Sequence, residues 1–247
     1  HIYCWADSTN DGWGRRVRYK AHVREPTKMP GVEDATFVAV GKRSTCIINR
    51  SGSVTCTGAI IMPPETNLPA GDPTFVTIEG VDDAVALSVG QHHGCLMDRS
   101  GRVQCFGNNR AGQLGDGTTK RSLAVARTVD GLGAASAVSV ADERSCATIG
   151  DGELHCWGDH DGRNFASGGF PKVHRTPEIV PDLRAKRLIA FDNTTCALTT
   201  DNELRCFGEY PDNPDGAAKA HIPRIMALPE PEKLRTLNQG VFFCGLW

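Results

Sequence analysis

The sequence predicts an all-β protein built as a β-propeller from repeats of about fifty residues. Three observations carry this prediction: pairs of cysteines recur with nine residues between them, a turn dipeptide lies midway in each pair, and no long helical pattern intervenes. All-β units of this length must stack or close upon one another to hide their edges. A linear β-solenoid is the alternative, but its coils are usually shorter and lack one hairpin per repeat.

Each cysteine pair is predicted to lie on one antiparallel hairpin and to form a disulfide. The pairs are Cys46/Cys56, Cys95/Cys105, Cys146/Cys156 and Cys196/Cys206, and their turn dipeptides are Ser51-Gly52, Ser100-Gly101, Asp151-Gly152 and Asp201-Asn202. Gly and Asn tolerate positive φ, so a tight turn at each dipeptide places the two cysteines opposite each other. Opposed Cβ atoms in such a pair come within disulfide reach.

The remaining strands of each unit are short and lie upstream of the hairpin. Alternating apolar segments run at 37–40, 85–89, 137–140 and 187–191, and turn signals precede them at 30–32, 79–81, 130–132 and 181–183, with a fifth at 229–231. Each unit therefore comprises three or four strands joined by Gly or Pro turns.

The two ends of the chain resemble the two halves of one further hairpin. Cys4 is followed by Trp5, as a second cysteine of a pair would be, and Cys244 matches a first cysteine. We expect one propeller domain over 1–247, with hairpin cores at 46–56, 95–105, 146–156 and 196–206 and a split hairpin formed by 1–4 with 244–247. Five blades are counted, closed by pairing of the terminal strands and a Cys4–Cys244 disulfide. The alternative is that the chain is a fragment of a larger ring, with its two ends falling at similar positions within a repeat.

Composition and cysteine spacing restrict the compartment and the partners. The formal net charge is −2, which argues against nucleic acid, and Arg15–Lys20 is interpreted as a solvated loop. No apolar run is long enough to cross a bilayer. Ten cysteines without Cys-x2-Cys or Cys–His clusters of zinc spacing favour disulfides, and therefore an extracellular, periplasmic or cell-surface location.

The stretch Cys105–Thr119, CFGNNRAGQLGDGTT, resembles the regulator of chromosome condensation repeat family, whose bacterial secreted members carry paired cysteines. The resemblance implies a β-propeller. Residues 85–119 match closely, whereas the other units keep the cysteine hairpin and, at Trp157-Gly158 and Phe207-Gly208, the aromatic-Gly step. Rings of this family usually have seven blades, and the nuclear exchange function of its founding member is not expected here.

Partner-binding candidates lie in the loops that differ between units, because repeat scaffolds carry function there. The apolar Ile60, Ile61 and Met62 either mark an exposed partner site or pack into an adjacent blade. Aromatic side chains in corresponding loops are further candidates, as are packing roles within those loops; they are Trp13, Phe165, Phe170 and Tyr210.

Sequence motifs that would indicate catalysis or metal binding are incomplete or do not occur. The stretches 159–162 and 212–216 resemble fragments of calcium loops but lack the full ligand series. His92-His93 occupies a position where the family has a structural histidine, and no catalytic serine elbow or zinc-protease motif occurs. We expect no enzyme, no cofactor and no metal.

The sequence therefore predicts a disulfide-stapled extracellular propeller that binds one or more proteins through loops on one face, or serves as an accessory subunit of a larger extracellular assembly. Inhibition of a secreted enzyme is an alternative within that class. A glycan-binding propeller that stacks sugars on Trp13, Trp157 or Tyr210 is the alternative from another class.

Overall fold

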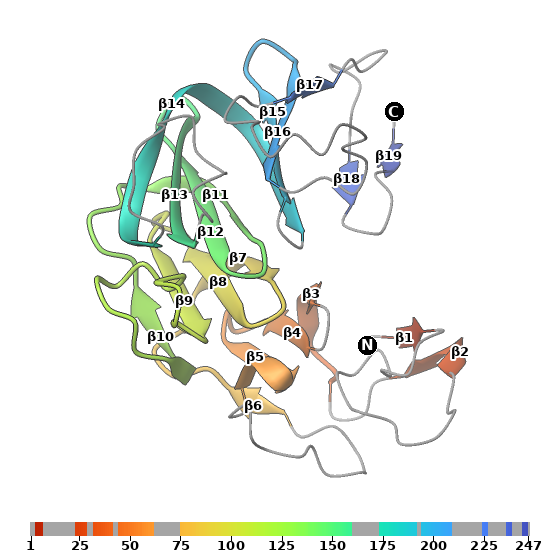
Figure 1. The fold of residues 1–247 in the computed structure, drawn as a ribbon. Helices are drawn as coiled ribbons and strands as arrows, with labels where there is room; N and C mark the ends of the chain where they lie inside the picture. The colour runs from red at the N-terminus through yellow and green to blue at the C-terminus, as the bar shows by residue number, and fades with distance from the viewer. Residues whose placement is uncertain are drawn as a thin grey trace.

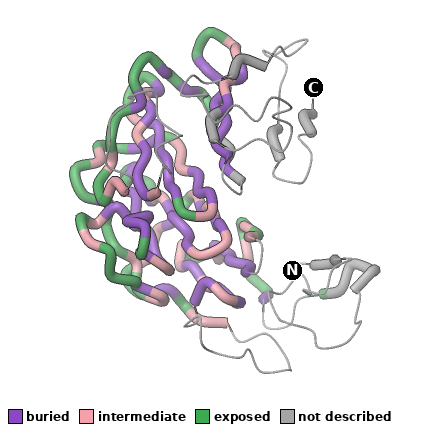
Figure 2. The backbone as a smooth tube through the Cα atoms, in the orientation of Figure 1, coloured by how far each residue is buried: buried purple, intermediate pink, exposed green. Residues whose placement is uncertain are grey.

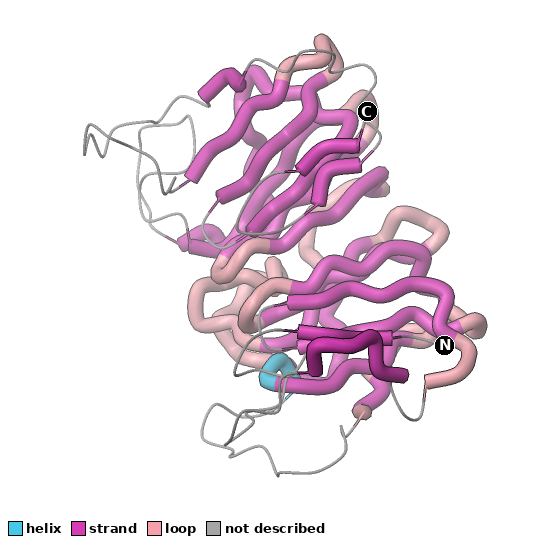
Figure 3. Tube along the Cα trace, turned by 90° about the vertical axis from the view of Figure 1, so that its right-hand side faces the viewer, coloured by secondary structure: helices cyan, strands magenta, loops and turns pink. Residues whose placement is uncertain are grey.

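A computed structural model of the chain describes residues 3–6, 23–28, 32–41, 44–61, 75–159, 173–191, 194–208, 224–226, 236–238 and 244–246. The described part is almost entirely antiparallel β-sheet, arranged as successive small sheets along an arc (Figure 1). The single helical element among these residues is a 3-10 turn, η1 (Ala59–Ile61), which stands out in Figure 3. No described helix is long and apolar enough to span a membrane.

Two complete four-stranded sheets form the first blades of the arc. One has the order β3 (Ala35–Gly41), β4 (Ser44–Asn49), β5 (Val54–Gly58) and β6 (Val76–Thr77); the other has β7 (Ala84–Val89), β8 (His93–Asp98), β9 (Val103–Gly107) and β10 (Ser122–Thr128). In each, consecutive strands are hydrogen-bonded neighbours. The predicted all-β propeller unit of short, sequentially paired strands is confirmed.

The next two blades share one long strand. The sheet runs β11 (Ala135–Val140), β12 (Arg144–Ile149), β13 (Glu153–Asp159), β14 (Val173–Phe191), β15 (Thr194–Thr199), β16 (Leu204–Gly208) and β17 (Arg224–Met226). Arg184 of β14 pairs with Glu153 of β13, and the next residue, Ala185, pairs with Thr199 of β15. The first half of β14 is thus the outer strand of one blade, and its second half is the inner strand of the next.

The ends of the chain form two separate strand pairs. β1 (Tyr3–Ala6) pairs with β2 (Val23–Lys28), and β18 (Thr236–Asn238) pairs with β19 (Cys244–Leu246). The two pairs lie apart at opposite ends of the arc (Figure 1). Pairing of β1 with β19 is not among the described ladders. Ring closure, the Cys4–Cys244 bond and the count of five blades therefore stay predictions.

Each complete hairpin carries the disulfide expected from its spacing. The bonds are Cys46–Cys56, Cys95–Cys105, Cys146–Cys156 and Cys196–Cys206, and the two cysteines of each are directly opposed in the ladder. All eight side chains are fully buried. The staples therefore lie inside the molecule, where they cross-link the middle strands of each blade.

The hairpin turns hold one blade against the next. Gly52, Gly101 and Gly152 have φ values of 86°, 84° and 92°, and their carbonyls accept hydrogen bonds of 2.9, 2.8 and 2.7 Å from Ala84, Ala135 and Ala185 of the following blade. A Cβ at Gly52 would lie 2.6 Å from the carbonyl oxygen of Asp82. Glycine is required at these tips for both the backbone angle and the close approach.

The apolar core lies between blades rather than at a common centre. Leu87 and Val89 of β7 pack with the Cys46–Cys56 bond, and Val140 of β11 packs with Cys95–Cys105. Figure 2 shows that the middle strands of the blades, such as β4, β8 and β12, are mostly buried. On β3 the equivalent residues, Val38 and Val40, are 43% and 55% exposed. The same face is therefore buried in the later blades and open at β3.

Candidate functional site

Loop 108–121 connects β9 to β10, and the structure describes every residue of it. Its hub is Asn109, which is fully buried. The Asn109 Nδ2 donates to Asp116 Oδ1 at 3.0 Å and to the Lys120 carbonyl at 3.1 Å, while its Oδ1 accepts the Leu114 backbone N–H at 2.9 Å. One side chain thus ties both arms of the loop together, and the backbone is ordered without regular secondary structure.

The middle of this loop reaches over the following blade. Gln113 offers its backbone carbonyl to the Trp157 Nε1–H and to the Ser145 hydroxyl, both at 2.9 Å. Leu114 packs in the same cluster as Trp157. Gly115 has φ 68°, and a Cβ there would lie 2.8 Å from Trp157 Nε1. The Gly-Gln-Leu-Gly element is therefore a clamp between two blades, which explains why these residue types occur together.

His93 lies beneath the clamp and is linked to it through Ser145. Its Nε2 is 2.7 Å from Ser145 Oγ, and both side chains are fully buried. Because the single hydroxyl proton of Ser145 goes to the Gln113 carbonyl, its oxygen accepts from the His93 Nε2–H. Burial and the neighbouring His92 lower the pKa of His93 from 6.5 to about 3, although the Asp142 backbone opposes this. The ring is a neutral structural group.

The distance between Ser145 and His93 is as short as that between a catalytic nucleophile and its base, but the accessibility of the serine and the direction of its proton differ. A nucleophilic serine must reach substrate and give its proton to the histidine. Here Ser145 is sealed from solvent and donates to a carbonyl. The pair serves blade packing.

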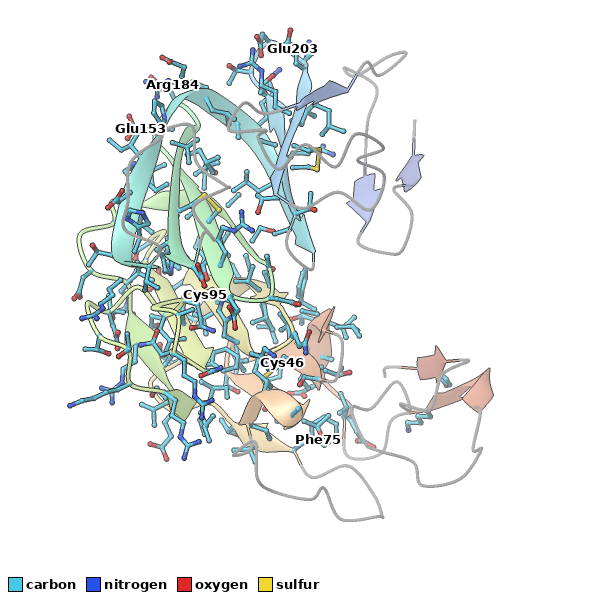
Figure 4. The ribbon with its side chains drawn as sticks, viewed as in Figure 1. Cys46, Phe75, Cys95, Glu153, Arg184 and Glu203 are labelled. Carbon is cyan, nitrogen blue, oxygen red and sulfur yellow. A yellow bond between two sulfur atoms is a disulfide. The ribbon has the colours of Figure 1, made fainter. Side chains whose placement is uncertain are left out.

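The opposite edge of the molecule carries the hairpin tips, which are closed by short polar networks. Asp98 accepts from the Ser100 hydroxyl at 2.6 Å and from Arg102 Nε at 2.8 Å. Burial raises the pKa of Asp98, but these hydrogen bonds outweigh it and hold the pKa below its ordinary value. Figure 4 shows Glu153, Arg184 and Glu203 on this outer edge, far from Cys46. The hydrogen bonds of Asp98 close its hairpin turn.

Ile60 and Ile61 are not available to a partner. They lie in η1 with 1% and 7% of their surface exposed, and they pack against Leu96 and Phe106 of the next blade. The Ile60 backbone N–H also donates to Ser44 Oγ at 2.9 Å. Of the two alternatives, packing into an adjacent blade is correct for these residues, because the chain turns inward directly after β5.

The other binding candidates lie outside the described residues: Trp13, Met62, Phe165, Phe170 and Tyr210. Trp157 is described and is fully buried, with its ring N–H bound to Gln113. It offers no platform for a sugar ring, so that part of the glycan hypothesis is wrong.

Among the described residues, no group of three or more His, Cys, Asp or Glu side chains is placed to hold a metal ion. Of the two stretches that resemble calcium loops, only Asp159 falls in the described part of the chain, at the end of β13.

The sequence analysis did not identify four basic side chains around loop 108–121 as a site. Arg110, Lys120 and Arg121 are exposed on the loop, and Arg175 is exposed on β14. Arg175 is more than fifty positions from the loop, yet its carbonyl accepts the Gly117 N–H at 3.0 Å. Sequence alone gave no signal for this proximity, because it arises from the packing of two blades.

Comparisons with known proteins agree with this geometry. Residues 84–113 match the model of the regulator of chromosome condensation (RCC1) repeat, which covers β7, β8, β9 and the clamp up to Gln113. No curated protein sequence matches the chain.

Several solved structures have a similar fold. The chain is 18% identical to human WBSCR16 with a TM-score of 0.69, over 89% of this chain and 61% of that one. It is 19% identical to yeast RCC1 (Prp20) in its crystal structure with Kap60, with a TM-score of 0.67, over 91% and 58%. For Prp20p from Saccharomyces cerevisiae the values are 14%, 0.61, 85% and 52%.

The chain thus spans less than two thirds of the length of these structures, and it shares their architecture at low identity. Residues 84–113 therefore match the RCC1 repeat, and the chain has the β-propeller fold of yeast RCC1 (Prp20).

Proposed function

We propose that this chain is an extracellular, non-catalytic module that binds proteins through the loop edge of its blades, as a recognition or accessory subunit. The observation that carries the proposal is loop 108–121, which is ordered by buried Asn109 and Trp157 and exposes polar side chains. A loop that is ordered before binding loses less conformational entropy when a partner binds.

The extracellular part of the proposal is supported by the four buried disulfides. Such bonds persist in oxidising compartments and are rare in the cytosol. The protein-binding part is supported by analogy of fold: yeast RCC1 (Prp20) is known in a crystal structure bound to Kap60. Fold alone does not transfer a partner, so the partner of this chain is to be found by experiment.

Site-specific photocross-linking tests the proposal. A photoreactive amino acid is placed at Thr119, which is exposed on the loop edge, and in a matched variant at Ser100, which is exposed on the hairpin-tip edge. Each oxidised protein is incubated with the extracellular fraction of its native source. We expect specific protein adducts from Thr119 and none from Ser100. Equal adducts from both positions, or none from either, would contradict binding through the loop edge.

The identity of the adducts separates the remaining alternatives. A single secreted enzyme, inhibited on binding, would make the chain an inhibitor; several assembly proteins would make it an accessory subunit. A glycan array run in parallel tests the glycan alternative, for which we expect no signal.

A further inference from the structure

The four basic side chains around loop 108–121 form one surface. The Asn109 Nδ2–H to Lys120 carbonyl bond brings the two arms of the loop together, and it places Arg110 beside Lys120 and Arg121. Arg175 joins them from the next blade, because a Cβ on Gly112 would lie 3.1 Å from Arg175 Cα. We call Arg110, Lys120, Arg121 and Arg175 the basic quartet.

The quartet is exposed and forms no ion pair among the described residues. All four residues are exposed, and none of them is paired with a carboxylate in the part of the chain that the structure describes. Two carboxylates lie at the loop: Asp116 accepts from Asn109 and from the Thr118 hydroxyl at 2.8 Å, and Asp130 Oδ2 would lie 3.5 Å from a Cβ on Gly117. Further along the same edge, Glu143 and Asp159 each have partners of their own. The four positive charges of the quartet therefore outnumber the two carboxylates at the loop.

The clamp fixes the backbone positions from which these four side chains extend. The Leu114 N–H bond to Asn109 and the Gly117 N–H bond to Arg175 hold the loop to its own blade and to the next one. Like charges on neighbouring positions repel one another, and an anionic partner would relieve that repulsion. An ordered cluster of cations without internal partners has the properties of a recognition surface for anions.

We infer that the basic quartet binds a carboxylate-rich segment of a partner protein, an inference that rests on the proposed protein-binding function. Three of the four side chains are arginines, whose planar guanidinium groups pair with carboxylates in a bidentate manner. The chain as a whole has a net charge of −2. A long polyanion such as nucleic acid would meet repulsion beyond the quartet, whereas a short acidic segment contacts the quartet alone.

Fluorescence anisotropy with defined peptides tests this inference on the full oxidised chain. The probes are a labelled peptide of about ten glutamates and a glutamine peptide of equal length, each at ~20 mM and ~300 mM salt, since salt screens exposed charges. The test variant is R110Q/R121Q, and the matched control is R50Q/R99Q, which removes two exposed arginines from the hairpin-tip edge.

We expect the glutamate peptide to bind at low salt, to lose at least about tenfold in affinity in R110Q/R121Q, and to change less than about twofold in R50Q/R99Q. Higher salt should weaken binding, and the glutamine peptide should not bind. Equal losses in the two double variants, absence of binding, or tighter binding of single-stranded DNA or heparin would overturn the inference.

The two proposals fail in different ways. If the protein adducts formed from Thr119 persist unchanged in R110Q/R121Q, the quartet is not the recognition surface while the protein-binding function stands. If no adducts form in any variant, the protein-binding function itself fails.

Discussion

His93 illustrates how a buried histidine couples this fold to pH. Its ring is sealed between two blades and donates to Ser145, and its pKa is lowered to about 3. The folded state therefore binds fewer protons than the unfolded chain between pH 6.5 and 3. Stability must fall as the pH drops through that window, because unfolding allows the ring to protonate.

We predict that His93→Gln reduces this acid sensitivity. At pH 4.5 the wild type should lose about 2–3 kcal/mol relative to pH 7 from His93 alone, and H93Q should lack that loss. Urea unfolding at the two pH values measures the difference. His92→Gln is the comparison variant and should keep most of the loss, because burial is the larger cause of the lowered pKa of His93 and His92 the smaller. The same pH dependence in wild type and H93Q would show that His93 does not carry it.

Asp182 occupies a backbone position that glycine fills in the other blades. Gly80 and Gly131 have φ values of 81° and 71° in the turn before the inner strand, and Asp182 has φ 56° at the equivalent place. We predict that Asp182→Gly stabilises the protein by about 0.5–1 kcal/mol, because an L residue is strained in this conformation. Thermal unfolding checks this, with Asp130→Gly as a control in which only flexibility is added. A lower melting temperature for D182G would contradict the strain.

At the scale of elements, the loop 108–121 clamp depends on one buried amide. We predict that Asn109→Ala costs about 2–4 kcal/mol, because it leaves buried backbone groups of the loop without partners. Asn108→Ala is the matched control, since its side chain makes only a 3.3 Å contact with the Arg110 N–H and should cost under about 0.5 kcal/mol. Urea unfolding and hydrogen exchange across 108–121 measure both. Similar costs for the two variants would show that Asn109 is not the hub.

The hairpins could be predicted from the sequence because their determinants are local. Nine residues between cysteines and a Gly or Asn at the tip fix the strand register, and the structure has that register in every described hairpin. The burial of Ile60 against the next blade and the proximity of Arg175 to loop 108–121 could not be predicted. Both depend on which surface the next blade presents, and repeat spacing carries no information about that surface.

At the scale of the whole molecule, the arc has an uncovered face at β3. Leu87, Val89 and Val140 lie at positions equivalent to Val38 and Val40, and each is buried under the preceding blade. A blade formed by β18, β19, β1 and β2 would cover Val38 and Val40 in the same way. Its strand order would place Cys244 opposite Cys4, as in the complete hairpins.

We predict that this blade forms. Val40→Ser should then cost about 2 kcal/mol, whereas Val85→Ser, at a position 45% exposed on β7, should cost under about 0.5 kcal/mol. Non-reducing peptide mapping should find a Cys4–Cys244 cross-link beside the four local ones. Free thiols at Cys4 and Cys244, together with equal costs for the two valine variants, would mean that the face at β3 has another partner or none.

The boundary inside β14 shows how the chain passes from one blade to the next. Six residues, 78–83 and 129–134, separate the outer strand of one blade from the inner strand of the next at the earlier boundaries. Within β14 the pairing with β13 skips from Ile179 to Arg184, and Ala185 already pairs with β15, so residues 180–183 take the place of those connections. A genetic duplication, deletion or exchange of blades therefore has residues to join at each of these boundaries, and the smallest inheritable module is a single blade.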